Sequence, residues 1–204
     1  MNRSAYYEQM KALARSTRSK YGLATPRVQR SDLRRIYRDQ RIHIDLWPQR
    51  LREVRGAYFS DELGSTVMLV KGLPDDPMVF TMAHELKHHL VDRAIRVTCC
   101  SERNANEHIE IGAEVFAAEF IFPELDFQNA LAAMGITTGK CSPEALVRLK
   151  HDTRTTLSYA GLAKRATFLG LASAGTLNQI RWKKLEEQIF GEPVYKRLLR
   201  RRAR

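Results

Sequence analysis

Two scarcities in this 204-residue sequence exclude whole classes of protein. Its three cysteines, Cys99, Cys100 and Cys141, are odd in number and show no C-x-x-C spacing, so we expect neither a disulfide framework nor a cysteine zinc clip. We expect all three to be small buried or half-buried side chains. No apolar run approaches the roughly 20 residues that a membrane-spanning helix needs, so we expect no membrane partner.

The start of the chain also lacks the features of an export signal. Residues 1–20 carry charges throughout and contain no apolar core of the kind found in signal peptides. With the unpaired cysteines, this predicts a reducing, cytoplasmic location. Hydrophobic residues make up 44% and charged residues 28% of the chain, which is typical of a globular protein with one compact core and at most a small appendage.

Charge is distributed unevenly along the chain. Residues 1–55 have a net charge of +9, residues 56–130 of −8 and residues 131–204 of +10, which gives +11 in total. Basic flanks favour contact with nucleic acid or an acidic partner, although solvated helix faces carry such charges equally well. The acidic middle is where a cation site is expected.

Hydrophobic periodicity predicts an α+β fold. Helices are expected over residues 4–20 and 33–40, with Ser31 and Asp32 as the N-cap of the second. Alternating segments at 42–46, 54–60 and 66–70 indicate a small antiparallel sheet. Helices follow at 79–91 and 107–122, separated by an irregular segment.

The last third of the chain is expected to be helical, over 124–134, 143–150, 156–169 and 176–190. The chain then ends in a basic tail, residues 196–204. We therefore predict a first domain over 1–130, a helical region over 131–192 and a tail over 193–204.

The strongest chemical signal is the motif His-Glu-Leu-Lys-His at residues 84–88. His84 and His88 are four residues apart on a predicted helix, so both imidazoles leave one face and can bind one zinc ion, although manganese is an alternative. Glu85 is placed to act as the general base on water. His89 leaves the helix in another direction, which favours a packing role, or a role in supporting a ligand, over a ligand role.

A catalytic zinc ion usually takes three protein ligands, so a third is expected from a nearby element. Glu110, on the next predicted helix, is the favoured candidate, and Glu114, His108 and Glu107 are alternatives. Glu110 and Glu114 are also four residues apart. Glu114 is then expected to accept a hydrogen bond from a ligand imidazole and so to orient it.

These two motifs together resemble the ImmA/IrrE family of regulatory metallopeptidases. Members carry a helix with the pattern Ala-His-Glu-x-x-His, which residues 83–88 match. They also carry a later helix whose pattern residues 110–123 match, above all in Phe-Ala-Ala-Glu-Phe-Ile-Phe-Pro at 116–123. The resemblance covers about residues 5–125. It implies a zincin-like metallopeptidase core, with Zn²⁺ as the cofactor and a helix-turn-helix transcriptional repressor as the protein substrate, cut at a single site.

The chain departs from the family pattern at two positions beside the site. Lys87 stands where members usually carry Gly or Ser, and Glu114 where they carry Asn or Asp. Many members also continue into a helix-turn-helix-like bundle, which residues 146–153 and 157–171 resemble. That segment is expected to dock a partner, to lie near DNA or to serve as a structural cap.

Three functions remain as alternatives. The first is a site-specific zinc endopeptidase of phage, mobile-element or stress regulation. The second is a DNA-binding or antirepressor regulator that keeps the peptidase fold and acts by binding through its basic flanks. The third combines them, with the basic surface bringing the peptidase to a DNA-bound repressor. Tyr159 and His151 are candidates to stabilise the oxyanion if the C-terminal helices cover the cleft.

Overall fold

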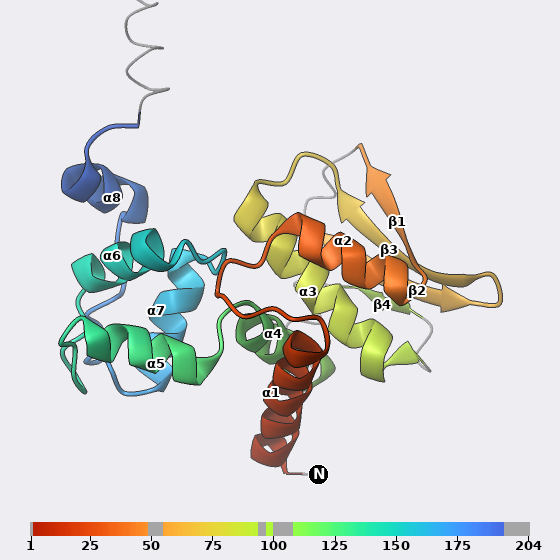
Figure 1. Ribbon diagram of the computed structural model, residues 1–204, viewed down its shortest axis with the longest axis horizontal. Helices are drawn as coiled ribbons and strands as arrows, with labels where there is room; N and C mark the ends of the chain where they lie inside the picture. The colour runs from red at the N-terminus through yellow and green to blue at the C-terminus, as the bar shows by residue number, and fades with distance from the viewer. Residues whose placement is uncertain (1, 49–54, 94–96, 100–107, 194–204) are drawn as a thin grey trace, which may run out of the picture. The chain divides into compact units, whose positions relative to one another are not determined.

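The computed structural model describes residues 2–48, 55–93, 97–99 and 108–193 (Figure 1). In this part of the chain it has eight α-helices and one four-stranded sheet, which confirms the α+β class. The chain divides into two compact units. The first comprises Met1–Asp126 with Thr155–Ser158, and the second Phe127–Arg154 with Tyr159–Arg204. The predicted domain bounds after residues 130 and 192 stay predictions.

The two N-terminal helices are α1 (Arg3–Lys20) and α2 (Arg30–Asp39). The N-cap of α1 is Asn2, whose side chain accepts a hydrogen bond from Ser4 N at 3.0 Å. Helix α2 begins three residues earlier than predicted, because Gln29 rather than Ser31 or Asp32 is its N-cap. Asp32 completes a capping box by accepting from Gln29 N.

The sheet is formed by β1 (Ile42–Trp47), β2 (Gly56–Asp61), β3 (Gly64–Val70) and β4 (Val97–Cys99), in the order β1-β3-β2-β4. Strand β2 pairs antiparallel with both β3 and β4, but β1 runs parallel to β3. The sheet is therefore mixed and not wholly antiparallel. The tight turn after Asp61 makes β2 and β3 a hairpin, which leaves the other edge of β3 for β1. Strand β4 lies within the segment expected to be irregular.

Two central helices, α3 (Asp75–Val91) and α4 (His108–Ile121), carry both sequence motifs. Helix α3 contacts β2 and β3 as well as α4, and α4 also packs against α1. Helix α3 begins four residues earlier than predicted. Asp75 and Asp76 lie in its first turn, where acidic side chains are favoured by the helix dipole. Close packing of α1 on α4 depends on Gly112, since a Cβ there would lie 2.5 Å from the Tyr6 ring.

The C-terminal helices are α5 (Glu124–Ala133), α6 (Pro143–Thr153), α7 (Tyr159–Phe168) and α8 (Trp182–Phe190). The predicted helices are present, but α8 starts six residues later than expected, since residues 176–179 form turns and residues 180–181 have no regular structure. Cys141 is a buried free thiol, as predicted, and burial raises its pKa to about 11. The predictions for the Cys99 side chain, for Cys100 and for the tail concern parts of the chain outside the described residues.

No helix within the described ranges is long and apolar enough to cross a membrane.

Candidate metal centre

Three buried side chains from two helices converge at one point in the first unit. His84 and His88 leave the same face of α3, and Glu110 comes from the first turn of α4. Their exposed fractions are 5%, 0% and 6%, respectively. One ligand atom from each lies within 4.8 Å of the others. Among the described residues, this is the group of histidine and acidic side chains that can hold a metal ion.

The spacing of these atoms matches a tetrahedral zinc site. Ligand atoms about 2.0–2.2 Å from a tetrahedral zinc ion lie about 3.3–3.6 Å from one another. Here His84 Nε2 lies 3.2 Å from His88 Nε2 and 3.1 Å from Glu110 Oε2, and His88 Nε2 lies 3.6 Å from Glu110 Oε1. Two imidazoles and one carboxylate are a donor set typical of catalytic zinc, so the residues present fit the ion.

Asp92, the C-cap of α3, orients the second histidine. Its Oδ2 lies 2.8 Å from His88 Nδ1. Burial raises the pKa of Asp92, but the hydrogen bonds from His88 and Lys87 and the positive charges of these two residues together lower it by more, so the pKa lies below its usual value. An ionised carboxylate can only accept, so His88 Nδ1 carries the proton and the lone pair of Nε2 faces the cluster.

Lys87 is fully buried and joins the two helices of the site. Its Nζ donates to Asp92 Oδ2 at 2.6 Å and to the backbone carbonyl of Ile109 at 3.0 Å. Ile109 directly precedes the candidate ligand Glu110. The same ammonium group lies 5.7 Å from the centre of the Tyr6 ring, within cation–π range. Lys87, one of the two residues that depart from the family pattern, therefore links α3 to α4 beside the candidate ligands.

Glu85 follows His84 on α3 and is completely buried. Its carboxylate lies against the start of β2, because a Cβ on Gly56 would be 2.9 Å from Glu85 Oε1 and 2.5 Å from Thr81 Cγ2. The pKa of Tyr37 is raised well above its usual value by burial and, in addition, by the negative charge of Glu85. A residue larger than glycine at position 56 would therefore displace the Glu85 carboxylate from its present position.

Two neighbouring histidines lie outside the cluster. His89 Nδ1 lies 3.2 Å from Tyr58 Oη, and burial, reinforced by the positive charge of Arg93, lowers its pKa to about 4. His89 is thus a neutral packing residue, as its direction on the helix predicted. The His108 ring lies 3.9 Å from the Tyr6 ring, centroid to centroid, and is not part of the group that can hold a metal ion.

The remaining candidates from the sequence stay predictions. Glu107 lies outside the described residues, and Glu114 is half-buried one turn beyond Glu110 on α4. In the second unit, Tyr159 donates to Glu186 at 2.9 Å and stacks on Trp182, while His151 stacks on Phe190.

Sequence reasoning missed Asp92 and the contacts of Lys87. The signal for Asp92 was available, since it stands four residues after His88, at the same spacing that joins the two histidines. The partners of Lys87 had no such signal, because Ile109 is 22 residues away in sequence.

Comparison with known proteins gives one family. The family model described as "IrrE N-terminal-like domain", of a peptidase family, matches residues 39–165, which include both motif helices. No curated protein matches the sequence significantly.

Proposed function

The chain belongs to the peptidase family of the IrrE N-terminal-like domain, and on that basis we propose that it is a zinc-dependent endopeptidase that makes a site-specific cut in a helix-turn-helix transcriptional repressor. The observation that carries the enzymatic part is the convergence of His84, His88 and Glu110. Glu85, which directly follows His84 on α3, is completely buried. Family membership supports a metallopeptidase-type function. Zinc, the repressor and the catalytic roles of single residues are our proposals.

In this mechanism each side chain of the chain has a distinct task. His84, His88 and Glu110 would hold the zinc ion, which supplies polarisation of the scissile carbonyl and a lowered pKa for the attacking water. Glu85 takes the proton from that water as its oxygen bonds to the carbonyl carbon, and passes the proton to the leaving amine as the C–N bond breaks. Asp92 and Lys87 keep His88 and the start of α4 in place.

The choice of substrate rests on the family resemblance and on the distribution of charge. A repressor bound to DNA is approached most readily by a protein with basic flanks, and residues 1–55 and 131–204 carry net charges of +9 and +10. Helices α6 and α7 of the second unit follow one another along the chain and are joined by residues 154–158. These elements are candidates for contact with the repressor or its operator.

The first experiment is metal analysis of purified wild-type protein and of the His84→Ala and Glu110→Ala variants. We expect close to one zinc ion per chain in the wild type and a large loss in both variants. Glu62→Ala, on an exposed turn, serves as the matched control and keeps the metal. Wild-type protein that holds no metal when zinc is supplied would contradict the proposal, and loss only in His84→Ala would exclude Glu110 as ligand.

The second experiment separates catalysis from binding. Glu85→Gln is expected to keep its zinc ion and to cut a repressor encoded beside its gene at least about 10³-fold more slowly, because the general base is gone. The basic flanks favour a second candidate, a DNA-binding or antirepressor regulator. In that case Glu85→Gln would relieve repression as well as the wild type, and the protein would bind operator DNA with a steep salt dependence.

A further inference from the structure

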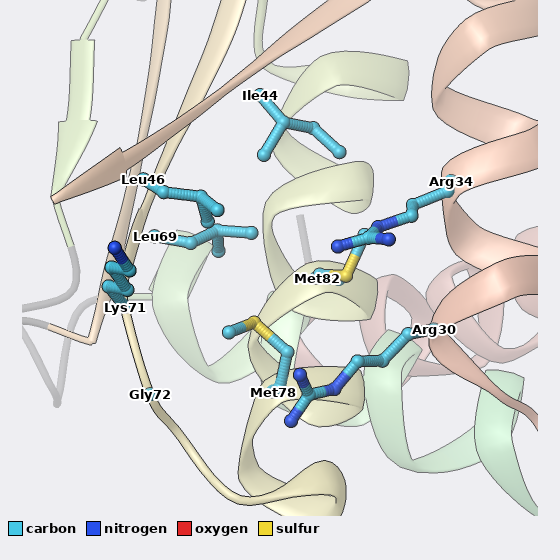
Figure 2. Close-up of a pocket in the computed structure, with 9 residues that line it drawn as sticks. All are labelled: Arg30, Arg34, Ile44, Leu46, Leu69, Lys71, Gly72, Met78 and Met82. Atoms are coloured by element: carbon cyan, nitrogen blue, oxygen red, sulfur yellow. The ribbon is translucent and has the colours of Figure 1, made fainter.

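A pocket of about 160 Å³ opens in the first unit between α2, α3, β1 and β3 (Figure 2). Its floor is apolar and is formed by Leu69, Met78 and Met82, each of which is at most 5% exposed. Ile44 and Leu46 of β1 extend the apolar lining. Leu46 is 44% exposed, which is unusual for a large aliphatic side chain on a sheet. The pocket therefore offers an apolar surface that the described chain leaves open.

Three cations surround this apolar floor. Arg30 is held in place, since its Nε lies 2.8 Å from Asp75 Oδ1 and its Nη2 donates to the Leu73 carbonyl at 2.6 Å. Arg34 and Lys71 are exposed, and neither side chain has a hydrogen bond or ion pair to any residue in the described ranges. Two positive charges are thus available for a partner at the edge of an apolar pocket.

The size of the pocket decides which kind of occupant fits. Drug-sized ligands and cofactors occupy about 300–1,000 Å³, which is more than this pocket provides. A cavity of about 150 Å³ holds a single benzene ring, so the pocket suits one aromatic or branched side chain. Nucleic-acid backbones are bound through charge and hydrogen bonds, so they would make no favourable contact with an apolar floor.

We propose that this pocket is a docking site for an acidic segment of a protein partner. One side chain of the size of Phe or Leu enters the apolar floor, and neighbouring Asp or Glu residues pair with Arg34 and Lys71. The segment belongs to the repressor, an assignment that rests on the proposed function. Met78 and Met82 lie on α3, the helix that carries His84 and His88, so the docked segment is held on the same helix as the metal ligands.

The test measures binding directly and needs neither metal nor catalysis. The probe is the peptide acetyl-Asp-Glu-Phe-Glu-Asp-amide, titrated into metal-free full-length protein with ¹³C-labelled methionine methyl groups. We expect saturable NMR shifts for the methyl groups of Met78 and Met82 and none for Met10 and Met134. Replacing Phe by Ala, or the four acids by their amides, should weaken binding at least about tenfold.

Variants then test the charges. Arg34→Glu with Lys71→Glu should weaken binding of the probe at least about tenfold. The control variant, Arg27→Glu with Arg148→Glu, has the same change in net charge, but at exposed residues outside the pocket. It should bind the probe as well as the wild type does. The proposal is overturned if the methyl groups show no saturable shift at millimolar peptide, or if the amide peptide binds equally well. It is also overturned if duplex DNA shifts the same methyl groups and the peptide does not. Metal analysis does not enter this test, so failure of the proposed function leaves its result intact.

Discussion

His88 Nδ1 lies 2.8 Å from Asp92 Oδ2, one helical turn further along the chain. This contact fixes which ring nitrogen of His88 faces Glu110 and His84, and it does so with a residue at the very end of α3. The metal centre therefore depends on the C-terminus of this helix and on the residues that hold it there. Burial lowers the pKa of His88 while Asp92 acts in the opposite direction, with the net effect a pKa below its usual value.

Replacing Asp92 by Asn should weaken zinc binding. The amide oxygen of Asn carries no full negative charge, so its hydrogen bond from His88 Nδ1 is weaker. His88 is then held less firmly and is a weaker base. Loss of such a partner typically costs about 10–100-fold in metal affinity. Competition with a chromogenic chelator measures the dissociation constant. Asp45→Asn, at an exposed position on β1, is the matched control. Equal affinity in Asp92→Asn and wild type would show that His88 needs no negative charge on its partner.

Lys87→Met should lower the stability of the metal-free protein. The substitution removes a buried ammonium group that donates to Asp92 and to the Ile109 carbonyl. Loss of one member of a buried charge pair leaves the other poorly compensated, so we expect a decrease of roughly 3 kcal/mol in the free energy of unfolding. Urea denaturation of the metal-free variant gives this value, and Lys183→Met, at an exposed position, provides the reference. Unchanged stability would mean that methionine packs as well as the ion pair.

Local patterns in the sequence were sufficient for most elements of the fold, but not for β4. The i, i+4 spacing of His84 and His88 and the apolar periodicity around them predicted α3, and alternation predicted β1, β2 and β3. The direction of β1 could not be predicted, because an alternating strand carries the same pattern whether its neighbour is parallel or antiparallel. The predicted starts of α2 and α3 were three and four residues too late, since the capping residues Gln29 and Pro74 lie outside the periodic segments.

The candidate metal ligands were more predictable than their surroundings. His84, His88 and Glu110 converge as their two motifs indicated. The environment of Glu85 depends on Gly56, which lies 29 positions earlier on another element and carries no motif. Contacts of this kind follow from the way α3 packs on the sheet, and a single sequence contains no local signal for them.

Gly56→Ala should reduce turnover without loss of metal. The new Cβ would lie 2.9 Å from Glu85 Oε1 and 2.5 Å from Thr81 Cγ2, so the carboxylate must move. Misplacement of a catalytic group by about 1 Å can cost on the order of 100-fold in rate. Repressor cleavage and zinc content are measured on the same preparation, with Ser60→Ala on the same strand as control.

Adding Thr81→Ser to Gly56→Ala distinguishes a catalytic effect from a loss of stability. The serine lacks the methyl group that the new Cβ meets first, so the double variant should regain stability while cleavage stays slow. If stability and cleavage rate both recovered in the double variant, Gly56 would act through packing alone.

The stability of the metal-free protein should rise with pH between about 4 and 6.5, in part through His89. Burial lowers the pKa of this imidazole to about 4 in the folded state, while the unfolded chain titrates near 6.5. The unfolded state therefore binds more protons within this window, so stability is lost as pH falls, by up to about 3 kcal/mol. Tyr58 and Arg93 are the groups that face His89, and Tyr58 also contacts Ser65.

His89→Gln removes this titration, so its stability should change less than that of the wild type between pH 7 and pH 4.5. Urea denaturation at the two pH values gives the difference, and His43→Gln, at an exposed position on β1, is the control that should behave as wild type. A residual dependence on pH is expected in every variant. Burial also lowers the pKa of His88, and Asp92, whose pKa is lowered as well, loses its stabilising contribution at still lower pH. If His89→Gln kept the full wild-type difference, the burial of His89 would contribute nothing to the pH dependence, and His88 would have to account for it.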